Sequence, residues 1–126
     1  MKTKLIPLVI LSLFLLSNCQ KKETIDFTIY LNFASSNFAC GTFKVSIDGS
    51  EKMNDQLCFQ GISPAFTYIK FPIESGSHII RAELIGNPTI FEQTYELSES
   101  QKFGYLNYNN DNSEFSFRLS ATGGID

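Results

Sequence analysis

The chain has 126 residues, of which 43% are hydrophobic, and it carries a formal net charge of −3 at neutral pH. A chain of this length builds one small domain. Its mildly acidic balance argues against a nucleic-acid partner and against attachment to anionic lipid through a basic surface. His78 is the only histidine, and the three cysteines lack the ligand spacing of a zinc site.

The N-terminus has the pattern of an export signal. Lys2 and Lys4 are followed by an apolar run from Leu5 to Leu16. As a helix, this run would extend about 18 Å, whereas the hydrocarbon core of a bilayer is about 30 Å thick. The run is therefore too short to span a membrane, and it predicts a signal peptide over residues 1–18.

The end of this run resembles the lipobox of bacterial lipoproteins. Leu16-Ser17-Asn18-Cys19 matches the motif, with Asn18 at the position where Gly, Ala or Ser is usual. The resemblance implies that Cys19 is lipidated, holds the protein to a membrane, and begins a tether over residues 19–24. Gln20 after the cysteine resembles an outer-membrane address. An ordinary secretory signal cleaved nearby and a short buried helix are the alternatives.

The other cysteines are consistent with export. Without residues 1–18 the chain keeps eight basic and thirteen acidic residues, and Cys40 and Cys58 remain as an even pair. Such pairs form disulfides in oxidising compartments. A Cys40–Cys58 bridge closes an eighteen-residue loop, which is worth about 3 kcal/mol in the chain-entropy model. Two separate buried thiols are the alternative.

From residue 25 to residue 120, apolar side chains recur mainly with a period of two, which is typical of strands with one buried face. Asp48-Gly49 predicts a tight hairpin turn between two of them. We expect an all-β domain over residues 25–120: a small antiparallel two-sheet sandwich of seven or eight strands, immunoglobulin-like in architecture. Residues 121–126 are expected to be a frayed tail.

Two regions depart from simple alternation. We expect a short strand from Glu51 to Met53, followed by an irregular stretch from Asn54 to Pro64. The segment from Ala65 to Phe71 is apolar on both sides, which predicts a central strand. Pro72 then ends this strand or lies at a sheet edge.

Two segments resemble the small PEGA-type sandwich domains of bacterial surface proteins. The run from Lys44 to Gly49 is similar to a strand and turn of these domains, and the run from Ile73 to Arg81 is similar to one of their hairpins. The Pro-Glu-Gly-Ala signature is absent. The resemblance implies the type of fold and carries over no functional residue.

The sequence predicts neither catalytic activity nor a cofactor. His78 lies beside a predicted turn at the start of a strand, where a solvated or edge histidine is expected. Glutamates 92, 96 and 99 lie on polar faces, and the chain has no phosphate-binding glycine loop and no serine elbow. The oxygen-rich stretch from Asn107 to Glu114 lacks the spaced acids of an EF-hand, so it predicts a plain loop rather than a calcium site.

Aromatic side chains are the remaining candidates for function. The chain has twelve Phe and five Tyr, and most Phe fall at inward positions of the predicted strands. Exposed aromatics gathered on one sheet face would indicate a partner or glycan surface. The candidates for such a face are Tyr30, Tyr68, Tyr105 and Tyr108, with Phe38 and Phe59 as further members.

These observations predict a lipid-anchored envelope lipoprotein, at the outer membrane, whose sandwich is a non-catalytic binding or adhesion module. Its partners would be the membrane, through the lipid on Cys19, and an unidentified protein or glycan. The alternative is a structural accessory subunit of an envelope assembly. An enzyme is a third hypothesis, and it needs His78 in one pocket with an acid and a hydroxyl group.

Overall fold

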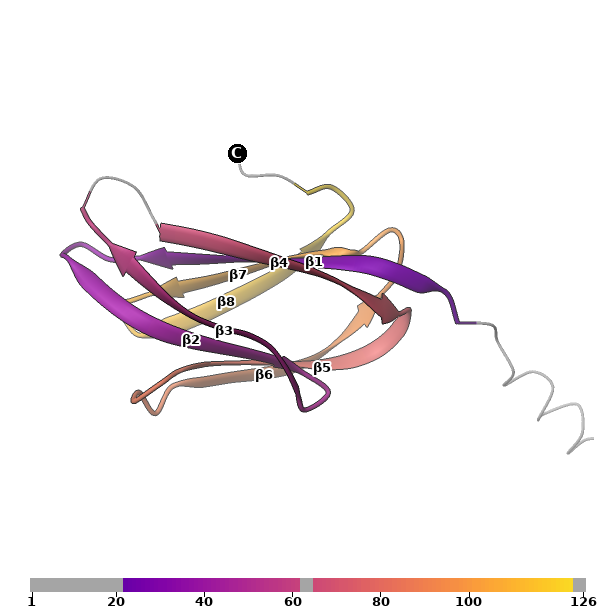
Figure 1. Ribbon diagram of the computed structural model, residues 1–126, viewed down its shortest axis with the longest axis horizontal. Coiled ribbons are helices and arrows are strands. Elements are labelled where there is room, and N and C mark those ends of the chain that lie inside the picture. The colour runs from indigo at the N-terminus through magenta and orange to yellow at the C-terminus, as the bar shows by residue number, and fades with distance from the viewer. Residues whose placement is uncertain (1–21, 62–64, 124–126) are drawn as a thin grey trace, which may run out of the picture.

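The computed structural model describes residues 22–61 and 65–123 as an eight-stranded body without a helix. No helix in these ranges is therefore long and apolar enough to cross a membrane. Figure 1 shows the strands in two layers. Their bounds are β1 Thr24–Ala34, β2 Ala39–Ile47, β3 Ser50–Phe59, β4 Ala65–Glu74, β5 Gly76–Leu84, β6 Ile90–Leu97, β7 Phe103–Asn109 and β8 Glu114–Ser120.

Each layer is a four-stranded sheet. Sheet A has the order β4-β1-β7-β8 and forms the upper layer in Figure 1, and sheet B has the order β3-β2-β5-β6. The strands pair antiparallel except β1 and β7, which run parallel. The predicted all-β, two-sheet sandwich is confirmed.

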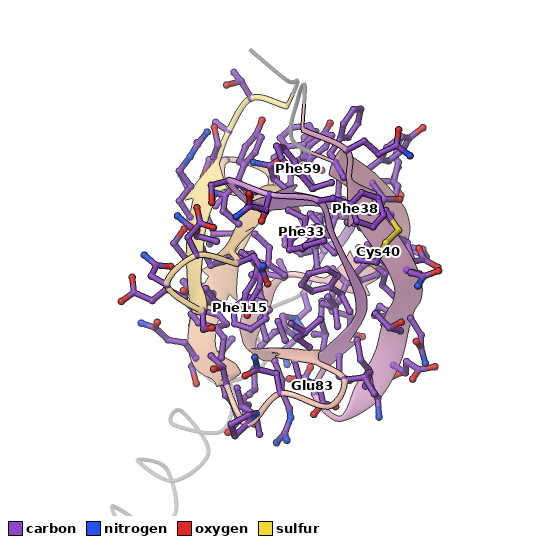
Figure 2. All side chains as sticks on the ribbon, turned by 90° about the vertical axis from the view of Figure 1, so that its left-hand side faces the viewer. Phe33, Phe38, Cys40, Phe59, Glu83 and Phe115 are labelled. Atoms are coloured by element: carbon purple, nitrogen blue, oxygen red, sulfur yellow. A yellow bond between two sulfur atoms is a disulfide. The ribbon has the colours of Figure 1, made fainter. Side chains whose placement is uncertain are left out.

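The core lies between the sheets and follows from the period-two pattern. Along β1, alternate side chains point inward and are fully buried, whereas Tyr30 and Asn32 point outward and are only half-buried. Figure 2 shows Phe33 between the two layers. Burying a large apolar side chain is worth about 1.5 to 3 kcal/mol, so this shared interior holds the sheets together. Its largest fully buried members are Tyr108, Phe27, Phe33, Phe43, Ile25, Ile29, Leu31, Ile47, Ile80, Leu97, Leu106 and Val45.

The β2–β3 hairpin has the predicted turn but a longer second strand than predicted. Asp48 and Gly49 both have positive φ, 52° and 81°, as the two central residues of a type I′ turn require. The prediction of an irregular stretch from residue 54 was wrong, because β3 continues to Phe59. β3 is an edge strand, and its polar, exposed residues 54–56 hide the alternation on which the prediction depended.

The prediction of a central strand at Ala65–Phe71 was also wrong. β4 lies at the edge of sheet A and continues through Pro72 to Glu74. Its second apolar face is not covered by another layer: Phe66 and Tyr68 are 52% and 62% exposed. An edge strand tolerates Pro72 because one side of its backbone needs no ladder partner.

Candidate functional site

Three of the four predicted tyrosines lie side by side on the outer face of sheet A. Tyr30 on β1 is the register partner of both Tyr68 on β4 and Tyr105 on β7. Tyr105 is in turn the partner of Arg118 on β8. The four side chains, which we call the tyrosine row, therefore cross all four strands of the sheet.

The rings of the tyrosine row contact one another, and one pair of them is stacked. Tyr30 and Tyr105 have ring centroids 5.1 Å apart with an interplanar angle of 16°, and Tyr30 and Tyr68 are 6.0 Å apart at 41°. The Arg118 guanidinium lies 4.1 Å from the Tyr105 ring centroid, a favourable cation–π distance. Tyr30 and Tyr105 thus each have neighbours on both adjacent strands and are half-buried, whereas Tyr68 at the sheet edge is 62% exposed.

The segment after β8 covers one end of this face. The Tyr105 hydroxyl donates a hydrogen bond of 3.0 Å to the Thr122 carbonyl. Gly123 lies so close to Phe103 that an added Cβ would stand 2.4 Å from the ring. Thr122 and Gly123 therefore contact sheet A, and Figure 1 shows the chain turning back above this layer. The rest of the predicted tail, residues 124–126, lies outside the described residues.

A polar row lies beside the tyrosine row, one step further along the strands. Asn32 on β1 pairs with Asn107 on β7, which pairs with Ser116 on β8. We call these three residues the amide row. Phe66 on β4 is the register partner of Asn32 and closes the row with an exposed ring. The outer face of sheet A thus carries stacked aromatics next to neutral polar side chains.

The amide row forms part of a depression of about 370 Å³ that continues to the β7–β8 hairpin. Glu114 is the single charged residue among those that line it. Within the described ranges, the side chains of Asn32, Asn107 and Ser116 have no intramolecular hydrogen-bond partner. Their donors and acceptors therefore face solvent. The polar residues of the lining are Asn32, Asn107, Asn109, Asn112, Glu114 and Ser116.

Tyr108 does not belong to this face, and its assignment there was wrong. Its side chain is 1% exposed and points into the core, with ring centroids 4.7 Å from Phe115 and 6.0 Å from Phe33. Its hydroxyl has no protein partner among the described residues. The odd spacing between Tyr105 and Tyr108 was the available signal, since residues three apart on a strand point to opposite faces. Phe59 is likewise buried, whereas Phe38 is 71% exposed in the β1–β2 loop.

The predicted disulfide between Cys40 and Cys58 is confirmed. The two residues are register partners on β2 and β3, with Cα atoms 4.0 Å apart. Figure 2 shows the bridge at the margin of the molecule, away from the buried Phe33. It fastens the edge strand of sheet B and takes no part in the outer face of sheet A. The predicted lipid-bearing Cys19 lies outside the described residues.

His78 joins two turns, whereas a solvated or edge histidine was predicted. Its side chain is 12% exposed, with Nδ1 2.5 Å from Asp48 Oδ2 and Nε2 2.7 Å from the Glu74 carbonyl oxygen. The Ile79 amide donates to Asp48 Oδ1 at 2.8 Å. Burial alone would raise the pKa of Asp48, but the hydrogen bonds from His78 and Ile79 and the charge of His78 outweigh it and lower that pKa. Both ring nitrogens of His78 face acceptors, so this side chain links the Asp48 turn to the end of β4.

The oxygen-rich hairpin loop also has internal partners. Asp111 Oδ1 accepts hydrogen bonds from the backbone amide and the hydroxyl of Ser36, at 3.1 and 2.9 Å. Asp111 in turn donates its amide to Asn109 Oδ1 at 2.9 Å. Among the described residues, no three or more His, Cys, Asp or Glu side chains are grouped to hold a metal ion. The Asp111 carboxylate therefore links the β7–β8 loop to the β1–β2 loop.

Comparison with known proteins gives no match: no family model, no curated protein and no solved structure matches the chain.

Proposed function

We propose that the protein is a lipid-anchored lipoprotein of the bacterial cell envelope and that its sandwich is a non-catalytic binding module. The lipobox-like residues 16–19 support the anchor. The register that aligns Tyr68, Tyr30 and Tyr105 in one row supports the outer face of sheet A as the binding face. Aromatic side chains gathered on an uncovered face are typical of binding surfaces.

The placement of this face relative to the predicted anchor fits that role. The chain enters β1 at Thr24, where the Glu23 carbonyl accepts a 2.7 Å hydrogen bond from the Ser75 amide. A strand rises about 3.3 Å per residue, so Asn32 lies about 26 Å further along β1 than Thr24. A lipid on Cys19 would therefore hold one end of sheet A near the membrane and leave the amide row at the far end.

The anchor is tested by mass spectrometry of the mature N-terminus. We expect a chain that begins at Cys19 and carries the mass of the attached acyl groups. Cys19→Ala should release the protein from the membrane fraction, because nothing else in the proposal holds it there. An unmodified N-terminus, or a Cys19→Ala protein that stays membrane-bound, contradicts the anchor.

The binding face is tested by photo-crosslinking in intact cells. A photoreactive phenylalanine analogue at Tyr68 should form adducts, because this ring is exposed at the edge of the face. The matched control places the same group at Gln56, an exposed position on β3 of the other sheet. Equal labelling at the two positions would contradict a binding role for the outer face of sheet A.

The alternative, a structural accessory subunit, is favoured by one observation. β8 is an edge strand of sheet A and β6 is an edge strand of sheet B. The two edges lie close together, since the half-buried rings of Tyr95 and Phe117 have centroids 4.6 Å apart. Such an edge can pair with a strand of another chain. A photoreactive group at Glu92 on β6 that captures one protein in stoichiometric yield, with no adduct at Tyr68, would support this alternative.

A further inference from the structure

We infer that the ligand of the outer face of sheet A is a neutral oligosaccharide, held by the amide row and by the exposed rings of Phe66 and Tyr68. This inference rests on the proposed function, because it names the class of ligand for the same face. The site is the depression of about 370 Å³ together with the open end of the tyrosine row.

The chemistry of the depression matches a ligand rich in hydroxyl groups. Each asparagine amide offers two donors and an acceptor, and Ser116 adds a hydroxyl that both donates and accepts. Asn32 and Asn107 lie on neighbouring strands, which are spaced about 4.8 Å apart. Side chains at that spacing are placed to contact adjacent hydroxyl groups on one sugar or on consecutive sugars.

The charge of the lining argues for a neutral ligand. Glu114 is its single charged residue, and its carboxylate accepts from the Asn112 side-chain amide at 3.3 Å. Arg118, the nearest cation in the register, is stacked on Tyr105 in the neighbouring row. A phosphate or a carboxylate in the depression would meet a carboxylate and no free cation from the lining residues. A sugar without charge meets no such repulsion.

The aromatic end completes the recognition of a sugar. Phe66 and Tyr68 are two residues apart on β4, so their rings project from the same face, and both are more than half exposed. Phe66 lies in register with Asn32 at the end of the amide row. A sugar ring has an apolar C–H face that packs on an aromatic ring through dispersion, while its hydroxyl groups remain directed to polar side chains.

A protein partner fits the same surface less well. The fully buried core of a protein interface is more apolar than the rest of the protein surface. Here the centre of the face between Phe66 and Ser116 consists of Asn32 and Asn107, whose amide groups would be left unpaired under an apolar patch. Leaving a polar group buried without a partner costs about 1 to 3 kcal/mol. A ligand that itself carries hydroxyl groups avoids this cost.

The inference is tested by calorimetric titration of the whole mature protein in a detergent without a sugar head group. The probes are gluco-, manno-, xylo- and chito-oligosaccharides, with an oligogalacturonate as the anionic comparison. We expect saturable binding of at least one neutral oligosaccharide and none of the anionic one. Asn32→Ala and Asn107→Ala should each weaken that binding up to about tenfold, the effect of losing one good hydrogen bond. Phe66→Ala should weaken it as well.

The matched control is Asn54→Ala, which removes an exposed asparagine from β3 on the other sheet and should leave affinity unchanged. Thermal melts of every variant establish that the fold is kept. The inference is overturned if no neutral probe binds, if the anionic probe binds better, or if the amide-row variants bind like the control. If the sugars fail while Tyr68 still crosslinks a protein, the ligand class is wrong and the binding face stands.

Discussion

Removing one buried oxygen atom should make this protein more stable. Tyr108 is 1% exposed, and its hydroxyl has no protein hydrogen-bond partner among the described residues. Burying a hydroxyl without compensation costs about 1 to 3 kcal/mol in protein mutational data. Tyr108→Phe keeps the ring and its contacts with Phe33, Phe43 and Phe115. We therefore expect the free energy of unfolding to rise by about 1 to 3 kcal/mol.

The measurement is a denaturant titration, supported by a thermal melt. For a domain of about 100 residues, each kcal/mol corresponds to about 4 °C in Tm, so the melting temperature should rise by about 4 to 12 °C. Tyr95→Phe is the matched control, because the Tyr95 hydroxyl donates to Gln93 Oε1 at 3.2 Å at an exposed site. Its stability should change by no more than about 0.5 kcal/mol. A Tyr108→Phe protein less stable than wild type would refute the reasoning.

Three further perturbations follow from described contacts. Replacing both Cys40 and Cys58 by serine removes the bridge of sequence separation 18, and chemical denaturation should show a loss of about 3 kcal/mol; an unchanged midpoint contradicts this. Asp48→Asn keeps a residue that tolerates the positive φ of 52° but loses the ion pair with His78. Because the folded state lowers the pKa of Asp48 below 3.8, the stability lost in this variant should be present at about pH 5 and vanish as the pH falls through the lowered pKa of Asp48; a difference that persists in strong acid contradicts the assignment. Gly104→Val places a side chain where a Cβ alone would stand 2.6 Å from Phe117, and the melt should show a loss of about 1 to 3 kcal/mol from overpacking.

Much of the sandwich was readable from local pattern. The alternation of Phe27, Ile29 and Leu31 with polar neighbours predicted the buried face of β1, since inward and outward positions alternate strictly along a strand. Asp48-Gly49 predicted its hairpin because those residue types tolerate positive φ. Local chemistry sufficed in both cases, because neither conclusion depends on which strands become neighbours.

Edge positions and the candidate site were harder to predict. A strand that is apolar on both sides, such as β4, reads the same whether another layer covers it or its outer rings stay exposed. β3 lacks alternation because its polar residues 54–56 lie at an edge exposed to solvent. The packing of Gly123 on Phe103 likewise could not be predicted from local pattern, because the two residues are far apart in the sequence.

The amino-acid sequence by itself determined the inward face of β1 and the chain reversal at Asp48-Gly49, because both depend on residues adjacent in the chain. Only the tertiary structure decided that Tyr30 lies between Tyr68 and Tyr105 and that Asn32 lies beside Asn107. These neighbours come from strands far apart in sequence. Their pairing is selected by the burial of a common core between two sheets, a property of the whole chain rather than of any one segment.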